Sequence, residues 1–391
     1  MRYDAAAMGM ANRYDVAVIG AGVFGAWTAW HLAQRGRRVA LIDAYGGANA
    51  RASSGGETRI VRMGYGADEL YTRFAVRSLA QWKEFFAKTR DPLFVHTGVL
   101  WLAGKEDSRL QETMATLKQH DVAFEEMDPV ALKKRYPQVN LEDVSAGILE
   151  VDSGLVLARR AVSAVIRDAI RHEVQYLQAL IATPRGSGRM EGVVTSKGQH
   201  ISAEHFVFAC GAWLGKIFPD VLGRRIFPTR QEVFFFGIPA GDTRFGPAEL
   251  PTWLFQEDQY YGMPDIEERG LKIAQDRHGE RVDPDTQSRI VSAEEIAEVR
   301  RYVARRFPAL RDAPIVETRV CQYENTSSGD FLIDQHPEME NVWFLGGGSG
   351  HGFKHGPAVG EYVSGQILDG LAAEPQFSLA SKDTVQRRTV H

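Results

Sequence analysis

Three glycines between a short apolar strand and a helix place the strongest constraint on how this chain of 391 residues can fold. Residues 14–19 (Tyr-Asp-Val-Ala-Val-Ile) are typical of a buried strand, and the segment 20–25 (Gly-Ala-Gly-Val-Phe-Gly) follows directly. A helix is expected over residues 26–34, and a second strand over 38–42 ends in Asp43. Strand, glycine turn, helix, strand and acid in this order are the signature of a dinucleotide-binding βαβ unit.

Each glycine of this motif has its own physical role. Gly20 permits the tight turn, Gly22 lets the backbone approach a pyrophosphate, and Gly25 lets the helix pack close to the strand. The free N–H groups and the dipole of the helix N-terminus would stabilise the phosphates, and Asp43 would accept hydrogen bonds from the ribose hydroxyls. Because an acid at this position disfavours a 2′-phosphate, the ligand is expected to be NAD or FAD.

A second glycine cluster at residues 346–352 (Gly-Gly-Gly-Ser-Gly-His-Gly) favours FAD. It follows an apolar strand at 342–345, and a helix with Pro357 in its first turn is expected after it. A second set of backbone donors suits the far end of a long cofactor, such as the N1–C2=O edge of a reduced flavin. A surface glycine loop is the alternative interpretation. If the cluster binds cofactor, the binding domain is built from both ends of the chain.

Composition excludes several classes of protein. With 46 basic and 50 acidic residues, the net charge of -4 gives no global field that would attract nucleic acid or an anionic membrane. Two cysteines, Cys210 and Cys321, are too few for a disulfide framework or a cysteine-rich metal site and suit a reducing compartment. Residues 1–12 have no signal-peptide core, and no later run reaches the roughly 20 apolar residues of a membrane span. We therefore expect a soluble cytoplasmic protein without nucleic-acid, membrane or metal partners.

Two kinds of secondary structure are expected in the rest of the chain. Amphipathic helices near residues 70–88, 162–170 and 293–307 would cover sheets. Aromatic-rich strands at 94–103 and 230–238 are typical of an antiparallel sheet that walls a ligand cavity. Two domains of different character are thus predicted.

Seven blocks spread over nearly the whole chain carry a more specific pattern. They are residues 14–25, 56–62, 230–233, 270–273, 321–323, 331–334 and 349–354. In this order they resemble monomeric sarcosine oxidase and N-methyltryptophan oxidase, which are FAD-dependent amine oxidases of the D-amino-acid-oxidase type. The resemblance implies an α/β protein (α+β overall), in which an antiparallel-sheet substrate domain is inserted into a doubly wound, Rossmann-type FAD-binding domain. The implied bounds are 1–92, 151–221 and 320–391 for the FAD-binding domain, and 93–150 and 222–319 for the substrate domain.

The resemblance also implies that Cys321 carries the flavin through an 8α-S-cysteinyl link. This cysteine lies in a polar segment shortly before the second glycine cluster, whereas Cys210 ends a strand and is expected to be structural. A covalent tether would prevent dissociation and raise the reduction potential of the flavin. The predicted cofactor-binding residues are Gly20, Gly22, Val23, Phe24, Gly25, Asp43, Ala44, Ser53, Thr58, Val174, Cys210, Gly211, Trp213, Cys321, Gly347, Gly348, Gly350, His351, Gly352, Phe353 and Lys354.

Arg62 and Lys354 match the family residues that hold the substrate carboxylate. A guanidinium can pair with a carboxylate through two parallel hydrogen bonds, and a lysine adds a second positive charge. Without the match, either residue would be taken for an ordinary solvated surface charge. The pair implies an amino-acid substrate rather than a simple amine.

Four further residues match catalytic positions of the family. Lys272 corresponds to the lysine near flavin N5, where a fixed positive charge stabilises superoxide as it forms. Arg59 corresponds to the arginine that shapes the same region. Tyr261 and Tyr323 correspond to tyrosines that line the amine site, although a strand tyrosine is more often a packing residue.

One catalytic position departs from the family. Sarcosine oxidase has a histidine four residues after the lysine, and this chain has Asp276. In a continued strand Lys272, Ala274, Asp276 and His278 would point to one face, so Asp276 would reach the cavity and His278 would substitute only in part. Our hypothesis is that Asp276 binds a polar or cationic group on a larger substrate, or raises the pKa of the amine.

The sequence therefore predicts a monomeric flavoprotein oxidase. It would oxidise a secondary or tertiary N-alkyl amino acid to the imine and reduce O2 to H2O2. A flavin dehydrogenase of the same fold that passes electrons to another acceptor is the nearest alternative. An NAD-dependent dehydrogenase and a flavin-binding module without turnover are more distant ones.

Substitution of Asp276 by Asn tests its predicted part in substrate choice. Loss of the negative charge should lower kcat/KM for N-alkyl amino acids with a cationic or polar side chain by about tenfold relative to alanine-like substrates. Steady-state rates over a panel of such substrates measure this ratio. Unchanged relative rates would remove Asp276 from the specificity determinants.

Overall fold

The computed structural model describes residues 13–105 and 108–387, so the expectation about residues 1–12 lies outside the described residues. The described chain divides into two compact units. The first comprises residues 13–57, 158–229 and 322–387, and the second comprises 58–105, 108–157 and 230–321. The predicted α/β class, with one unit inserted between segments of the other, is the one observed.

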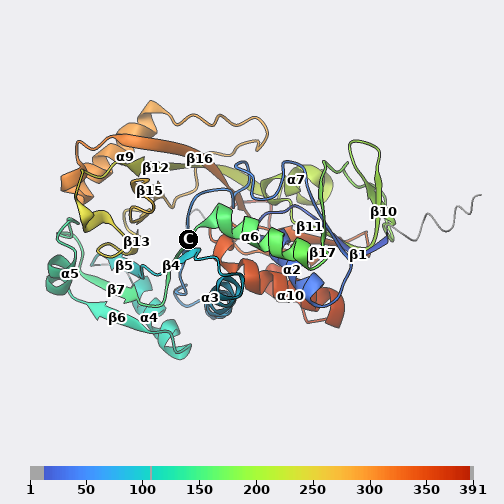
Figure 1. Cartoon of the computed structure of the whole chain (residues 1–391), viewed down its shortest axis with the longest axis horizontal. Helices are drawn as coiled ribbons and strands as arrows, with labels where there is room; N and C mark the ends of the chain where they lie inside the picture. The colour runs from blue at the N-terminus through green and yellow to red at the C-terminus, as the bar shows by residue number, and fades with distance from the viewer. Residues whose placement is uncertain (1–12, 106–107, 388–391) are drawn as a thin grey trace, which may run out of the picture. The chain divides into compact units, whose positions relative to one another are not determined.

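The first unit is built on a sheet with the order β17-β18-β11-β1-β2-β9, and β10 pairs with β11 beside this path. The strands of this sheet are β1 (Arg13–Ile19), β2 (Val39–Asp43), β9 (Gln175–Gln178), β10 (Gly192–Val194), β11 (His200–Phe208), β17 (Leu332–Gln335) and β18 (Val342–Gly346). The pairs β1–β2, β1–β11, β2–β9 and β11–β18 are parallel, and β17 is an antiparallel edge. This is the predicted Rossmann-type sheet, with its strands drawn from both ends of the chain (Figure 1).

Helices α2 (Val23–Gln34), α6 (Ala158–Arg171) and α10 (Gly356–Asp369) pack together in the first unit. A Cβ atom on Gly360 of α10 would lie 2.6 Å from the backbone of Trp27, so the glycine allows α10 to touch α2 directly. Trp30 of α2 donates a 2.8 Å hydrogen bond to Asp168 of α6. Helices α2 and α10, which come from opposite ends of the described chain, therefore share one layer, as the blue and red ribbons of Figure 1 show. Short helices α7 (Leu214–Ile217) and α8 (Pro219–Leu222) follow β11.

The second unit contains a larger sheet with the order β16-β12-β15-β14-β13-β5-β7-β6. Its strands are β5 (Val99–Ala103), β6 (Phe124–Met127), β7 (Ala146–Glu150), β12 (Phe227–Phe236), β13 (Thr252–Phe255), β14 (Tyr260–Met263), β15 (Leu271–Gln275) and β16 (Ile315–Asn325). Helices α4 (Arg109–Gln119), α5 (Pro129–Arg135) and α9 (Ala293–Arg306) accompany it. The expected antiparallel pairing holds for most neighbours, but β5 and β13 are parallel because a long crossover connects them.

The four predicted boundaries, after residues 92, 150, 221 and 319, lie after residues 57, 157, 229 and 321 in the structure. The largest difference concerns residues 58–92, which the sequence places in the FAD-binding domain and which belong to the second unit. The reason is strand pairing and helix packing: β3 (Arg59–Val61) pairs with β8 (Gly154–Val156), and β8 also pairs with β4 (Phe94–Val95). Helix α3 (Glu69–Thr89) packs on β4 and α4.

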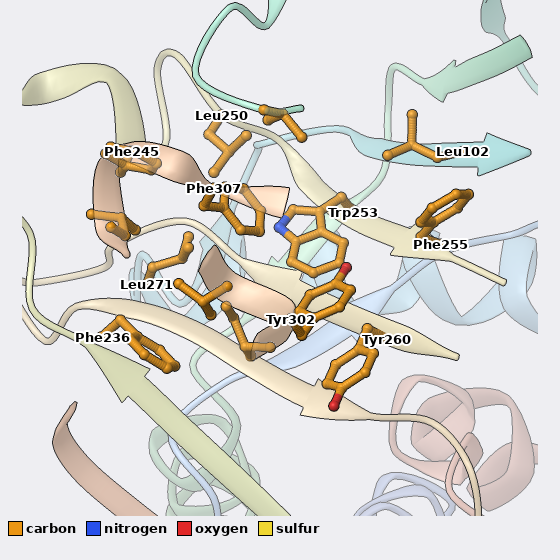
Figure 2. Close-up of a cluster of buried hydrophobic side chains, with 14 of the residues drawn as sticks. Leu102, Phe236, Phe245, Leu250, Trp253, Phe255, Tyr260, Leu271, Tyr302 and Phe307 are labelled. Carbon is orange, nitrogen blue, oxygen red and sulfur yellow. The ribbon is translucent and has the colours of Figure 1, made fainter. Parts of the chain in front are cut away.

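The core of the second unit lies between its sheet and α9, where aromatic residues of β12, β13 and β14 are buried (Figure 2). Tyr302 of α9 stacks on Tyr260 at 3.8 Å between ring centroids and on Trp253 at 6.2 Å. Side chains on the other face of β12 and β15, including Phe235 and Ala274, form a separate small cluster. The aromatic strands therefore fill a core on one face and leave the opposite face for other contacts.

Arg306 anchors the end of α9. Its side chain is 2% exposed, pairs with Asp143 at 2.8 Å and with Asp258 at 2.7 Å, and lies over the ring of Phe255. Two carboxylates and an aromatic face compensate this buried charge. In the described part of the chain, no helix combines the length and the apolar character that a membrane crossing needs.

Candidate active site

The first glycine motif forms a turn that only glycines can make. Gly20 has φ of +105°, and a Cβ atom there would lie 2.2 Å from the carbonyl oxygen of Ala209. A Cβ atom on Gly25 would lie 1.9 Å from the carbonyl oxygen of Gly20. Gly22 precedes α2, and a Cβ atom there would meet only the hydroxyl of Ser54, at 3.4 Å. The backbone at the start of α2 is thus open to a close ligand, and none of the described side chains caps the helix.

Asp43 lies at the end of β2, at the same sheet edge as this turn. Its carboxylate accepts hydrogen bonds from the backbone N–H groups of Ala21 and Tyr45, both at 2.8 Å. Burial raises the pKa of Asp43 above its ordinary value, and the backbone donors oppose this shift. The acid is therefore fixed beside the glycine turn, where the dinucleotide signature requires it.

The second glycine cluster packs against the first. A Cβ atom on Gly352 would lie 2.9 Å from the ring of Phe24, and one on Gly356 would lie 2.6 Å from Val23. Phe24 also contacts Phe331 edge to face, with ring centroids 5.4 Å apart. Five of the seven residues of the cluster are buried and Gly350 is exposed, so the cluster is packed into the unit along most of its length. Two segments about 320 residues apart in sequence thus meet at one helix N-terminus.

Glu324 is a residue of this region that the sequence analysis missed. The backbone N–H groups of Gly347 and Gly348 donate hydrogen bonds to its carboxyl group, and burial raises its pKa to about 8. These two amides are therefore not free donors, although both were predicted to bind cofactor. The Oε1 atom of Glu324 is buried without a hydrogen-bond partner among the described residues, so it is available to a ligand. The sequence around Glu324 carries no local signal for this role, because the amides that donate to its carboxyl group, those of Gly347 and Gly348, lie far away along the chain.

The other predicted cofactor residues of the first unit lie near these two segments or in its core. Cys210 follows β11, donates from Sγ to the carbonyl of Ile19, and has a thiol pKa raised by burial, which fits a structural role. The ring of Trp213 lies 5.6 Å from that of Tyr45. The remaining positions are Ala44, Ser53 and Gly350 in bends and turns, Gly211 at the start of a 3-10 helix, and Val174, His351 and Phe353 at buried positions.

A separate cluster in the second unit brings together four predicted residues. Lys272 is 3% exposed, and its Nζ donates to the carbonyl oxygen of Thr58 at 2.8 Å and to its hydroxyl at 3.1 Å. Arg59 donates to the same carbonyl at 2.8 Å and to Sγ of Cys321 at 3.5 Å. Two positive charges and the half-buried Cys321 thus share one small region.

Arg62 is the third cation of the second unit that the sequence singled out. Its side chain is 6% exposed, and its guanidinium donates a hydrogen bond to the carbonyl oxygen of Gly64. The guanidinium lies 4.4 Å above the ring of Tyr65 and 4.7 Å above the ring of Trp101. Aromatic faces stabilise the cation without using its N–H donors, which leaves donors for an anionic ligand.

The remaining predicted residues are distributed over both units. Lys354 belongs to the first unit, is 4% exposed and donates to the carbonyl of His351 at 3.0 Å, so it and Arg62 lie on different units. Tyr323 is also in the first unit, packed close to Gly350. Tyr261 lies in β14 of the second unit, beside the cluster that contains Ala274.

The expected alternation of side chains between the two faces of the strand does not continue from Lys272 as far as His278. Strand β15 ends at Gln275, and Asp276 follows it, half-buried, with its N–H donated to Gln259. His278 instead lines a pocket of about 160 Å³ with Gln275 and Phe234, on the α9 side of the sheet. The strand geometry on which the predicted partial substitution by His278 was based therefore ends at Gln275, and that substitution stays a prediction. In the described residues no group of His, Cys, Asp and Glu side chains could hold a metal ion.

These features define a class: an α/β protein with a dinucleotide cradle in one unit and a group of buried cations in the other. The profile of the family described as "DAO: FAD dependent oxidoreductase" matches residues 15–366. The chain belongs to this family and is an FAD-dependent oxidoreductase. The open backbone at Gly22 and the buried Oε1 of Glu324 fit a large polar cofactor of this kind.

Relatives with assigned activities match over nearly their whole length. Monomeric sarcosine oxidase of Bacillus sp. (strain NS-129) is 31% identical over 394 residues, which cover 97% of this chain and 100% of the relative. N-methyl-L-tryptophan oxidase of Salmonella arizonae is 28% identical and covers 94% of this chain and 97% of the relative. The family resemblance predicted from the seven sequence blocks is confirmed.

Solved structures show the same fold. Fructosamine oxidase from Aspergillus fumigatus aligns with a TM-score of 0.82 at 22% identity, over 96% of this chain and 92% of its own. L-proline dehydrogenase from P. horikoshii also gives 0.82 at 22% identity, over 94% of this chain and 97% of its own. The predicted fold class is confirmed.

Proposed function

We propose that this enzyme oxidises a secondary or tertiary N-alkyl amino acid to the imine and transfers the electrons to O2. A secondary amine loses two electrons and two protons to give the imine, whereas a tertiary amine loses two electrons and one proton to give the iminium ion. O2 takes up two electrons and two protons to give H2O2, and water hydrolyses the imine or the iminium ion, which in the second case releases the remaining proton. Bound FAD supplies the two-electron chemistry that links these half-reactions. The activities named for the sarcosine and N-methyltryptophan oxidases support this substrate class.

The buried guanidinium of Arg62 is the observation that supports this proposal most strongly. A buried guanidinium between two aromatic rings, with one hydrogen bond to Gly64, is suited to accept an anion. A carboxylate would restore its charge-assisted hydrogen bonds and compensate its burial. A substrate held by its carboxylate has its C–H bond oriented for transfer, which lowers the entropic part of the barrier. Lys354 is proposed to add a second charge to the same carboxylate.

Lys272 and Arg59 are proposed to support the reaction with oxygen. Thr58 fixes both side chains through its carbonyl oxygen, so their charges are held in place before reaction. A preorganised positive charge stabilises negative charge that develops on O2. Tyr261 and Tyr323 remain proposed to line the amine site.

Peroxide release is expected to match substrate consumption one to one. The flavin-loaded enzyme is mixed with N-methyl amino acids, their primary amino acid analogues and their N-methyl amides, and H2O2 is measured with a peroxidase-coupled dye. The N-methyl acids should react best, and the amides should lose at least about tenfold in kcat/KM because they lack the carboxylate.

One variant and one anaerobic measurement distinguish a failure of the reaction with O2 from a failure of amine oxidation. Lys272→Met should slow reoxidation by O2 about a hundredfold and leave anaerobic bleaching of the flavin within a few fold. Bleaching without peroxide would point to a dehydrogenase with another acceptor. If no amine bleaches the flavin anaerobically, amine oxidation itself is contradicted.

Covalent attachment of the flavin through Cys321 is a separate proposal. Arg59 donates to Cys321 Sγ and would stabilise negative charge on the sulfur, whereas Cys210 is tied to the carbonyl of Ile19. Acid precipitation should give a yellow pellet from the wild type and from Cys210→Ser, and a colourless pellet with yellow supernatant from Cys321→Ser. A yellow supernatant from the wild type would rule the link out.

A further inference from the structure

Glu150 is a buried carboxylate that the proposed reaction does not use. It ends β7, and its side chain is 0% exposed. Oε1 accepts hydrogen bonds from Trp101 Nε1 at 2.8 Å and from the Gly64 N–H at 3.0 Å. Oε2 accepts from the Met63 N–H at 2.7 Å and from the Ser153 hydroxyl at 2.5 Å. Each oxygen thus has two donors, which satisfies a charge that would be costly to bury alone.

Two of the residues that donate to Glu150, Gly64 and Trp101, also contact Arg62. The guanidinium of Arg62 contacts the carbonyl of Gly64 and the rings of Tyr65 and Trp101. Glu150 binds the amide of Gly64 on one side and the indole N–H of Trp101 on the other. Two of the three contacts of Arg62 are therefore fixed in place by one carboxylate.

Close packing around Gly64 leaves the backbone at residues 63–64 no room for another conformation. A Cβ atom on Gly64 would lie 2.6 Å from Thr113, 3.0 Å from Glu150 Oε1 and 3.0 Å from the Trp101 ring. The backbone of residues 63–64 is thus pressed between Glu150 and its neighbours. Because the packing and the four hydrogen bonds to Glu150 together fix residues 63–64 and Trp101, they also fix the direction of the Arg62 side chain.

We infer that Glu150 is a positioning residue for substrate carboxylate recognition: it fixes Gly64 and Trp101, and these orient Arg62. This inference rests on the proposed role of Arg62. Glu150 would not touch the substrate. Its effect would be to hold two N–H donors of Arg62 in the geometry that a bidentate pair with the substrate carboxylate needs. Because this geometry exists before the substrate binds, less conformational entropy is lost on binding.

Glu150→Gln is the variant that separates this role from simple space filling. The amide has nearly the same shape, but one of its two oxygens becomes an NH2 group. In one orientation of the amide, its NH2 group would face the Gly64 N–H and the Trp101 Nε1–H, and these two donors would have to shift. In the other orientation, the Ser153 hydroxyl could turn to accept from the NH2 group, but the Met63 N–H could not, so the backbone next to Gly64 would have to shift.

The test compares a charged ligand with a neutral one on the flavin-loaded enzyme. Acetate and acetamide are titrated in, and binding is followed by the change in the visible flavin spectrum. Glu150→Gln should weaken acetate binding by about tenfold and leave acetamide binding unchanged. With an N-methyl amino acid, the KM should rise by a similar factor while kcat stays within about threefold.

Asp258→Asn is a matched control. It makes the same chemical change at a half-buried carboxylate of the same unit, one that pairs with Arg305 and Arg306 instead. It should lower the melting temperature and leave the ratio of acetate to acetamide affinity unchanged. If Glu150→Gln does not fold, Ser153→Ala removes one donor from Glu150 and no contact of Arg62, and it should weaken acetate binding two- to threefold, or by about 0.5 kcal/mol.

The outcomes distinguish the inference from the proposed function. If Arg62→Met removes the preference for acetate and Glu150→Gln keeps it, the role of Glu150 is overturned and that of Arg62 stands. An equal loss for acetate and acetamide would also overturn it, since that is the signature of general damage. If the wild type shows no preference for acetate, or Arg62→Met retains it, the proposed carboxylate site itself is wrong.

Discussion

The close approach of Gly25 to the carbonyl oxygen of Gly20 is the constraint on which the cofactor unit depends. No side chain fits between them, so α2 begins directly at the end of β1 with its N–H groups uncovered. The second glycine segment reaches the same helix through Gly352 and Gly356, which touch Phe24 and Val23. The β1–α2 turn thus fixes both the place of a phosphate site and the way in which distant segments of the chain join.

In the second unit the corresponding constraint is the burial of positive charge. Lys272 is held by Thr58, and Arg62 is held by Gly64 and two rings. Burying such charges costs free energy unless they are stabilised, and Arg62 is stabilised by a neutral carbonyl oxygen and two aromatic faces. An anion would stabilise this buried guanidinium further, so its position is suited to binding a carboxylate. By contrast, Arg306 has two carboxylate partners and serves the fold.

The sequence predicted the βαβ unit well because spacing and residue type at Gly20, Gly25 and Asp43 are local properties. It also identified Arg62 and Lys272, although only through resemblance, since an arginine or lysine has no local signal of burial. The pairing of β3 with β8 could not be read locally, so residues 58–92 were assigned to the other domain. Glu150 and Glu324 were missed for a similar reason: their roles come from backbone N–H groups far away in sequence, and an acid at a strand end looks like any solvated residue.

The central claim is that Arg62 receives the carboxylate of the substrate. A crystal structure of the flavin-loaded enzyme, soaked anaerobically with an N-methyl amino acid at a few times its Kd, tests it most directly. Both carboxylate oxygens are predicted to lie about 2.7–2.9 Å from nitrogen atoms of the Arg62 guanidinium. A substrate bound with its carboxylate away from Arg62 would contradict the account.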